Sequence, residues 1–275
     1  MSIDCCAVVL AAGAGTRLRP LTLHRPKALC PVDNVPLLER TLRRLAGLGI
    51  AGPDTVAVNA CYLGEQIVAV VGDRARLSVE PPPALGTSGG VARLRDWIAG
   101  RAALVCNADA YLPEAYAADL LAGWDGSTVR MLVVPPAPGK PGEFGDARQW
   151  RFAGMSLLPW RVVETLPRRT GELVSTAWRP AEAAGALEFV RFGGEFFDCG
   201  TPADYLAANL HASGGQSVIG EGAEVHGRLT RSVVWPGGYV AASEHLVDTI
   251  RAARDITVPA HPDPATLDGP PRGSV

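Results

Sequence analysis

A glycine-rich loop and two cations near the start of the sequence have the types and spacing that bind phosphate. The loop, Gly13-Ala14-Gly15-Thr16, follows the first apolar run, with Arg17 directly after it and Lys27 ten residues further on. Backbone N–H groups, a guanidinium and an ammonium neutralise a polyphosphate in complementary ways. The spacing therefore predicts a phosphate-binding loop, with a structural turn and two solvated cations as the alternative.

Two well-known phosphate-binding motifs do not account for this loop. A Walker A loop needs GxxxxGK[ST], and no Lys-Ser or Lys-Thr follows the glycines. A dinucleotide-binding fingerprint needs a third glycine where Leu18 stands. What remains is a strand, a flexible turn whose backbone N–H groups can face an anion, and an arginine directly after the turn.

The elements around this loop alternate between strands and helices. Residues 5–11 form an apolar run typical of a strand that is buried on both faces, and residues 37–48 have the periodicity of an amphipathic helix. Further strands are expected at 55–58, 77–79, 102–106, 131–134, 152–158 and 187–192, and further helices at 64–71, 89–97 and 202–210. This order predicts an α/β, Rossmann-like fold with a mixed, mainly parallel sheet layered between helices.

The pattern of apolar residues and glycines changes after residue 211. Apolar residues recur between 219 and 240 at a spacing that resembles the hexapeptide repeat of a left-handed β-helix. One to one and a half coils would fit, so we expect this stub to pack against the main domain or another subunit, with a β-hairpin cap as the alternative. We predict a main domain over 1–211, a truncated β-helix-like extension over 212–258 and a disordered tail over 259–275.

Composition narrows the function classes. The 275 residues carry 26 basic and 28 acidic side chains, a net charge of −2 that gives no reason to expect a nucleic-acid partner. The early apolar run is too short for a transmembrane helix, and the N-terminus lacks the positive segment of a signal peptide. The six cysteines form no CxxC pair, so we expect reduced thiols, no zinc site, no membrane partner and a cytoplasmic location.

The N-terminal run is similar to the signature of sugar-1-phosphate nucleotidyltransferases. Residues 10–32 follow the family's pattern LAAGxGTRLxPLTxxxPKxLxPV, with Cys30 at an unconstrained position, and the resemblance extends over residues 5–210. It implies the transfer of a nucleotide from a nucleoside triphosphate to a sugar 1-phosphate, which yields a nucleotide sugar and pyrophosphate. The anionic sugar phosphate needs no general base, so catalysis consists of positioning and charge neutralisation.

The resemblance assigns roles to individual residues. Arg17 and Lys27 are the expected catalytic cations: Arg17 holds the β- and γ-phosphates, and Lys27 lies near the α-phosphate and the incoming sugar phosphate. The family's LGTxG loop, which holds the base and ribose, matches Leu85-Gly86-Thr87-Ser88-Gly89. The expected nucleotide-binding residues are Leu10, Ala12, Gly13, Ala14, Gly15, Thr16, Arg17, Gly86, Thr87 and Ser88.

Two aspartates match the family's magnesium ligands. Asp109 lies in Asn107-Ala108-Asp109, and Asp198 lies in Phe197-Asp198-Cys199-Gly200-Thr201-Pro202. Mg²⁺ prefers a few carboxylates together with phosphate oxygens and water, which two aspartates at strand ends can supply. The alternatives are that Asp109 is a turn residue and that Asp198 caps the helix after Pro202.

The sequence matches the family's motifs less completely for the sugar phosphate than for the nucleotide. Asn107 and Lys27 are expected there with Gly145, which lies in a match to the GDFG loop, and Gly154, which lies in a match to the F-x-G strand. The Glu-Lys-Pro segment whose lysine touches the sugar phosphate in many relatives is missing, and we assign that role to Lys140, with a solvated loop cation as the alternative.

Two other functions compete with this one. A molybdopterin guanylyltransferase of the same fold lacks the Pro20-Leu21-Thr22 segment, so this segment favours a sugar substrate. A non-catalytic regulatory paralogue that binds nucleotide sugars usually lacks a metal aspartate or the arginine. Within the family we expect GTP or UTP as the nucleotide, mannose 1-phosphate or a related hexose or heptose phosphate as the acceptor, and a homodimer through the C-terminal stub.

Overall fold

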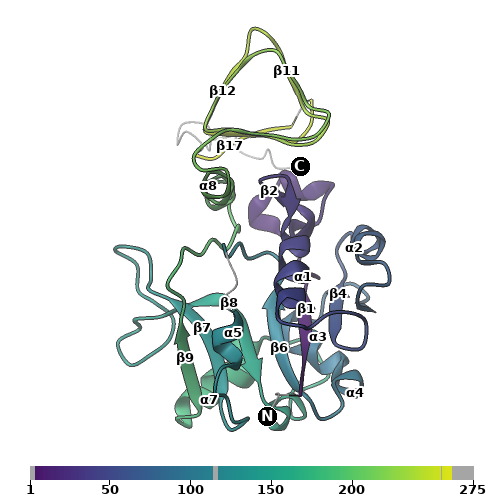
Figure 1. Cartoon of the computed structure of the whole chain (residues 1–275), viewed down its shortest axis with the longest axis vertical. Coiled ribbons are helices and arrows are strands. Elements are labelled where there is room, and N and C mark those ends of the chain that lie inside the picture. The colour runs from purple at the N-terminus through teal and green to yellow at the C-terminus, as the bar shows by residue number, and fades with distance from the viewer. Residues whose placement is uncertain (1–3, 114–116, 255, 262–275) are drawn as a thin grey trace, which may run out of the picture. The chain divides into compact units, whose positions relative to one another are not determined.

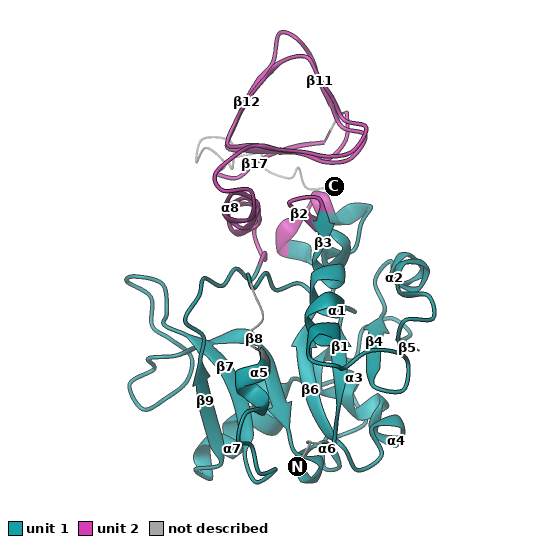
Figure 2. Ribbon diagram, viewed as in Figure 1, with its two compact units in different colours: residues 1–16, 22–30, 35–198 teal, residues 17–21, 31–34, 199–275 magenta. Residues whose placement is uncertain are grey.

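The computed structural model describes residues 4–113, 117–254 and 256–261, which form two compact units (Figure 2). Unit 1 comprises the N-terminal residues through Thr16, Thr22–Cys30 and Val35–Asp198. Unit 2 comprises Arg17–Leu21, Pro31–Asn34 and the chain from Cys199 onward. Of the predicted tail over 259–275, residues 262–275 lie outside the described residues.

A seven-stranded sheet forms the centre of unit 1 (Figure 1). Among its described strands, only β8 runs antiparallel to its neighbours β6 and β7, and the other adjacent pairs are parallel. Valine, leucine and alanine fill the central strands because both faces of the sheet are covered. In spatial order the strands are β5 (Arg76–Val79), β4 (Val56–Ala60), β1 (Cys5–Leu10), β6 (Ala102–Asn107), β8 (Arg151–Leu158), β7 (Val129–Val134) and β9 (Leu187–Arg191).

Helices cover both faces of this sheet, and each face has its own hydrophobic core. On one face lie α1 (Leu37–Gly47), α2 (Gly64–Val71) and α5 (Ala117–Leu121). On the other lie α3 (Gly86–Arg93), α4 (Arg95–Ile98), α6 (Trp160–Val163), the π-helix η4 (Val174–Trp178) and α7 (Arg179–Ala183). The predicted Rossmann-like α/β fold with a mainly parallel sheet is therefore confirmed.

The predicted helix over 89–97 is wrong in its bounds. The chain forms two helices there, α3 from Gly86 and α4 from Arg95, and Leu94 interrupts them with φ −89° and ψ 2°. The short helices between Trp160 and Ala183 were not predicted. These three are only four or five residues long, too short to show a clear helical period in the sequence.

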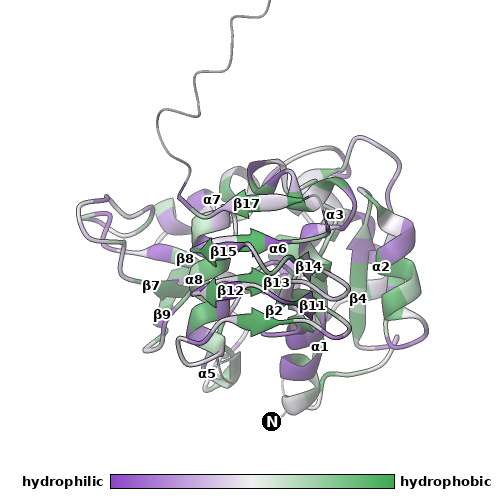
Figure 3. Ribbon diagram, turned by 90° about the horizontal axis from the view of Figure 1, so that it is seen from above, coloured by the Kyte–Doolittle hydropathy of each residue, from purple (hydrophilic) through white to green (hydrophobic). Residues whose placement is uncertain are grey.

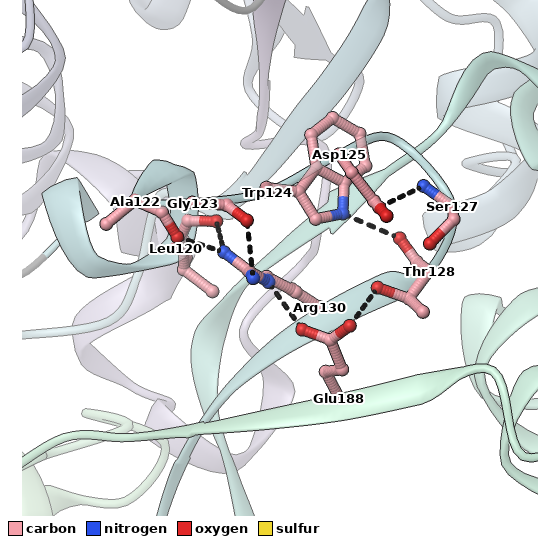
Figure 4. A network of polar contacts seen from close by, with 9 residues as sticks. All are labelled: Leu120, Ala122, Gly123, Trp124, Asp125, Ser127, Thr128, Arg130 and Glu188. Atoms are coloured by element: carbon pink, nitrogen blue, oxygen red, sulfur yellow. Dashed lines mark hydrogen bonds and ion pairs between the residues drawn. The ribbon is translucent and has the colours of Figure 1, made fainter.

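A polar network closes the β7–β9 edge of the sheet (Figure 4). Arg130 donates from Nε to Glu188 Oε2 at 2.7 Å and from Nη1 to the carbonyl of Ala122 at 2.6 Å. The Thr128 hydroxyl donates to Glu188 Oε1 at 2.6 Å. These bonds, from Thr128 first and Arg130 second, lower the pKa of Glu188. The Glu188 carboxylate of β9 therefore links this strand to β7 and to the turn that precedes β7.

Unit 2 contains α8 (Pro202–Ala212) and a coil of short strands with a triangular outline (Figures 1 and 2). Parallel pairs run along three sides: β10 with β13 and β16, β11 with β14, and β12 with β15. The strands are β10 (Val218–Ile219), β11 (Glu224–Val225), β12 (Arg228–Thr230), β13 (Val233–Val234), β14 (Tyr239–Val240), β15 (His245–Val247), β16 (Thr249–Arg251) and β17 (Thr257–Pro259). These pairings extend past Val240, so the coil makes about two turns rather than the one to one and a half that we expected.

The interior of the coil is apolar, and α8 is bonded to it within the same unit. Val234, Val240 and Leu246 form its buried core, and β13 is coloured hydrophobic in Figure 3. The indole N–H of Trp235 donates to the Tyr205 hydroxyl of α8 at 2.9 Å. That hydroxyl donates to the carbonyl of Pro31 in β2 (Pro31–Val32). The strand β17 pairs antiparallel with β16, so ordered structure continues past residue 258, where we expected a tail to begin.

All six cysteines are free thiols. Burial raises the pKa of the Cys6, Cys30 and Cys106 thiols to about 12, so these side chains act as small apolar groups. In the described part of the chain, no helix combines the length and hydrophobicity needed to cross a bilayer.

Candidate active site

The glycine loop leaves the carboxyl end of β1 with free backbone donors. Among the described residues, no acceptor takes a hydrogen bond from the N–H groups of Gly13, Ala14 or Gly15. Gly15 has φ +57°, and a Cβ there would lie 3.0 Å from Cβ of Lys27. Glycine is therefore required both for the turn and for the close approach of the lysine stem, and the free N–H groups suit an anion.

Lys27 joins the two aspartates that the sequence singled out. Its side chain is 9% exposed, and its Nζ donates to Asp109 Oδ2 and to the backbone carbonyl of Asp198, each at 2.8 Å. The residue lies in the 3-10 helix η3 (Lys27–Leu29). One ammonium group therefore contacts both the Asp109 side chain and the Asp198 backbone, although 89 positions separate these residues in the chain.

A two-residue bridge fixes the position of the aspartates. The Tyr111 N–H donates to the Phe197 carbonyl at 2.8 Å, and the Phe197 N–H donates back at 3.1 Å. Their rings pack with centroids 5.8 Å apart. Because Asp109 lies two residues before Tyr111 and Asp198 directly follows Phe197, this antiparallel bridge brings both acids to the carboxyl end of β6.

Arg151 is a functional candidate that the sequence analysis missed. Its Nη2 lies 3.2 Å from Asp198 Oδ2, and its guanidinium lies over the Phe196 ring, 5.0 Å from the centroid. Arg151 and Asp198 side chains are each 32% exposed, so both are open to a ligand. The signal for Arg151 in the sequence is a charged residue at the start of an otherwise apolar strand.

A cavity of about 230 Å³ opens beside Asp109 and the glycine loop, and neither Asp198 nor Arg151 lines it. It is lined by seven of the predicted residues: Leu10, Ala12, Gly13, Gly86, Thr87, Asn107 and Asp109. Asn59, Ala84 and Glu172 complete the lining and were not predicted. A smaller cavity shares Leu10, Gly13 and Asp109 with it and reaches Gly15 and Lys27. The glycine loop, the lysine and one aspartate thus border a continuous region of the surface.

The loop before α3 is packed against the segment that ends at Glu172. Gly86 has φ +73°, and a Cβ there would lie 2.5 Å from the Gly171 carbonyl and 2.7 Å from Glu172 Oε1. The Thr87 hydroxyl donates to Glu172 Oε2 at 2.7 Å. Any larger residue at position 86 would displace these contacts, so the glycine of the LGTxG match is required by packing.

Other predicted residues lie apart from the two cavities. Ser88 is fully buried, and its N–H donates to the Gly171 carbonyl at 3.0 Å. The Gly145 N–H donates to Glu182 Oε1 at 2.8 Å, and Lys140 is exposed in a loop. Gly154, with φ +79°, packs beside Ala110, where a Cβ would lie 2.8 Å from Cβ of that residue.

Arg17 and Thr16 form a 3-10 turn, η1 (Thr16–Leu18), in which both are exposed. Arg17 belongs to unit 2, whereas the glycine loop belongs to unit 1. The contact of Arg17 with a triphosphate therefore stays a prediction. Thr201 is the N-cap of α8, accepting from the Asp204 N–H at 3.2 Å, so helix capping does not explain Asp198.

The two aspartates offer a set of donor atoms that fits Mg²⁺. Among residues 4–113, 117–254 and 256–261, no three His, Cys, Asp or Glu side chains are grouped to hold a metal. Mg²⁺ needs only one or two carboxylates when substrate phosphates and water complete its shell. Asp109 and Asp198, with side chains 36% and 32% exposed, supply that number.

Comparison with known proteins agrees with this geometry. The family model described as the MobA-like NTP transferase domain matches residues 7–256, nearly the whole chain. The chain belongs to this family. The matched range includes the glycine loop, Lys27 and both aspartates.

Two curated relatives are each 38% identical to this chain over an alignment of 109 residues. One is the N-acetylmuramate alpha-1-phosphate uridylyltransferase of Neisseria meningitidis serogroup B, with 38% of this chain and 46% of the relative aligned. The other is the mannose-1-phosphate guanylyltransferase of Mycobacterium tuberculosis, with 38% of this chain and 29% of the relative aligned. The chain thus spans less than half the length of these two relatives.

A solved structure shares the fold over nearly all of both chains. It is described as mannose-1-phosphate geranyltransferase from Thermus thermophilus, with a TM-score of 0.69 and 20% sequence identity. The match covers 94% of this chain and 96% of that one. At this identity the similarity establishes the fold and leaves the chemistry to the site residues.

Proposed function

We propose that this protein joins a nucleoside triphosphate, GTP or UTP, to a sugar 1-phosphate and releases pyrophosphate. The observation that carries the proposal is the Lys27 ammonium, bonded at 2.8 Å both to Asp109 and to the Asp198 carbonyl beside the glycine loop. A cation held by one carboxylate and one backbone carbonyl beside free N–H donors suits phosphoryl chemistry between two anions, because that chemistry needs fixed positive charge. The named activities of the relatives support the sugar 1-phosphate as acceptor.

The reaction needs charge neutralisation more than proton transfer. An oxygen of the sugar phosphate attacks the α-phosphorus, the bond from that phosphorus to the bridging oxygen breaks, and pyrophosphate leaves with the electron pair. The N–H groups of Gly13–Gly15 would bind phosphate oxygens of the nucleotide, and Lys27 would face the α-phosphate. Arg17 would hold the β- and γ-phosphates.

Magnesium fits the two carboxylates as a group bound together with the nucleotide. Asp109 and Asp198 would hold it, and when bound it supplies positive charge to the triphosphate. The ammonium of Lys27 offsets part of the charge of Asp109, and the guanidinium of Arg151 offsets part of the charge of Asp198. Arg151 would bind the sugar phosphate on the Asp198 side, in place of the lysine that the missing Glu-Lys-Pro segment would supply.

We also infer that the triangular coil of unit 2 is a short left-handed β-helix. The hexapeptide spacing and the three sides of parallel strands support this interpretation. Pairing of two copies through this coil stays a prediction.

A product screen tests the proposed function. The full chain is incubated with Mg²⁺, GTP or UTP and a panel of hexose and heptose 1-phosphates. Pyrophosphate is measured with a coupled assay and the nucleotide sugar by mass spectrometry. We expect pyrophosphate and nucleotide sugar in equal amounts for at least one pair. Nucleotide binding without pyrophosphate from any pair would instead favour the regulatory paralogue.

A further inference from the structure

The nucleotide cavity contains a carboxylate that phosphate binding cannot use. Among the described residues of its lining, Glu172 is the one charged side chain apart from Asp109. The smaller cavity, which holds Gly15 and Lys27, meets the larger one at Leu10, Gly13 and Asp109. Phosphates therefore belong at that shared border. Glu172 lines only the larger cavity, together with Ala84 and Thr87. We expect the base of the nucleotide to bind in this part of the cavity, because the phosphates occupy the shared border.

Hydrogen bonds hold Glu172 firmly in this position. Its Oε2 accepts from the Thr87 hydroxyl at 2.7 Å and from the Thr87 N–H at 3.3 Å. The same hydroxyl accepts from the Leu173 N–H at 2.7 Å. The Gly171 N–H donates to the Leu85 carbonyl, and the Ser88 N–H donates to the Gly171 carbonyl, each at 3.0 Å. Hydrogen bonds thus join the two chain segments into one wall of the cavity.

The second carboxylate oxygen is available to a ligand. A Cβ on Gly86 would lie 2.7 Å from Glu172 Oε1, which places this oxygen directly over a residue of the cavity wall. None of the described residues donates a hydrogen bond to Oε1. A carboxylate has about four acceptor positions, and the Thr87 contacts use those on Oε2 only. Glu172 therefore presents a negative, accepting oxygen to the base end of the cavity.

Only one of the four common bases matches such a group. Guanine presents N1–H and the N2 amino group side by side, two donors with no acceptor between them. Adenine and cytosine each pair an amino group with a ring-nitrogen acceptor, and uracil flanks its single N–H with two carbonyl oxygens. A fixed carboxylate attracts the guanine edge and repels an edge that carries acceptors.

We infer that Glu172 reads guanine and makes GTP the nucleotide substrate. This inference rests on the proposed function for the placement of the nucleotide, and it narrows GTP or UTP to GTP. Glu172 is a specificity residue: it binds the base and leaves the reacting phosphates to Lys27, Asp109 and Asp198.

Nucleotide binding without a sugar phosphate tests this inference separately from catalysis. Calorimetry measures the affinities of GTP, ITP and UTP with Mg²⁺ for the wild type and for Glu172→Gln. ITP lacks the N2 amino group of GTP but is otherwise identical. We expect the wild type to bind GTP about tenfold or more tightly than ITP or UTP. In Glu172→Gln, GTP affinity should fall to that of ITP, and UTP affinity should change less than twofold.

A matched variant separates base reading from support of the loop. Thr87→Ala removes the hydroxyl that holds Glu172 Oε2 while keeping the carboxylate, so we expect it to weaken GTP more than ITP or UTP but by a smaller factor than Glu172→Gln does. If Glu172→Gln weakened all three nucleotides equally, Glu172 would act only as a loop support or a ribose contact, and the inference would be overturned. A wild type that prefers UTP would overturn it as well. Failure of the proposed function would show differently, as absent pyrophosphate despite selective GTP binding.

Discussion

Lys27 brings one positive charge to the Asp109 carboxylate, the Asp198 carbonyl and, on our proposal, two substrate phosphates. The Lys27 side chain is nearly buried, with only 9% of its surface exposed to water. Its stem packs against Gly15, and its Nζ is bonded at 2.8 Å to both acidic segments. A charge fixed in this way needs little reorganisation during the reaction, which is the property that makes preorganised cations effective.

Arg151 makes a longer contact with Asp198 than Lys27 makes with Asp109, and we expect a different role for it. A single contact of 3.2 Å to Asp198, with both side chains 32% exposed, is a screened interaction. A phosphate can accept two parallel hydrogen bonds from a guanidinium, so it is the better partner. We predict that Arg151→Gln raises the KM for the sugar phosphate about tenfold or more and leaves the KM for GTP within twofold.

Steady-state kinetics with each substrate varied in turn measures this split. Arg43→Gln is a suitable control because Arg43 is exposed on α1, where it pairs with Glu39. Equal increases in both KM values would contradict the assignment and indicate that Arg151 only orients Asp198. Partial recovery in Arg151→Lys would support a charge that contacts phosphate.

Sequence reasoning predicted the residues that lie in contiguous motifs and missed those that tertiary packing supplies. The structure brings Lys27, Asp109 and Asp198 together, and each lies in a short run that resembles the family signature. Arg151 directly precedes the match to the F-x-G strand without being part of it, and Glu172 lies in a segment with no such run. Their positions depend on Asp198 and on Thr87, 47 and 85 residues away in the chain.

At the scale of elements, a buried polar link connects the glycine loop to the loop before α3. The Ala11 N–H donates to Asn59 Oδ1 at 2.6 Å, and Asn59 Nδ2 donates to Glu80 Oε1 at 2.8 Å. Glu80 Oε2 then accepts from the Leu85 N–H at 2.8 Å. Asn59 and Glu80 are 1% and 2% exposed, so water does not compete for these bonds. The two loops around the nucleotide cavity are therefore set by one chain of hydrogen bonds.

We predict that Glu80→Gln weakens both folding and nucleotide binding. Glu80 must accept twice, from Asn59 and from Leu85, and glutamine has one acceptor oxygen. Asn59 cannot turn its amide around, because its oxygen accepts from Ala11. One buried donor is left unpaired, which costs about 1–3 kcal/mol. Urea denaturation should show this loss, and calorimetry should show weaker binding of GTP and UTP alike.

The exposed Glu65 on α2 provides the comparison for this prediction. Glu65→Gln removes the same charge from the surface and should change neither the free energy of unfolding nor nucleotide affinity appreciably. Identical behaviour of the two variants would contradict the role of the buried link. A selective loss of GTP affinity in Glu80→Gln would do so too, because this link holds loops and does not contact the base.

The strands were easier to predict than the short helices for a physical reason. A strand covered on both faces requires an apolar run, and such runs mark β1 and β6 directly. The helices between Trp160 and Ala183 gain their stability from packing against the second core. Leu94, which separates α3 from α4, carries no sequence signal for a break.

At the scale of the whole molecule, the two units are not continuous in sequence. Unit 2 takes in residues 17–21 and 31–34 as well as the chain from Cys199. The reason is contact at long range: the Tyr205 hydroxyl donates to the Pro31 carbonyl, and the Asp33 N–H donates to Asn209. Our predicted domains followed the chain in order, and a linear pattern does not carry contacts of this kind.

Pyrophosphate release by Asp109→Asn tests the central claim most directly, because the substitution removes one charge from the Lys27 site without changing its size. We predict that the wild type releases pyrophosphate only when Mg²⁺, nucleoside triphosphate and sugar 1-phosphate are all present. Asp109→Asn should be slower by a factor of about 10²–10³ or more while its thermal unfolding stays cooperative. A folded Asp109→Asn variant that releases pyrophosphate at nearly the wild-type rate would contradict the account.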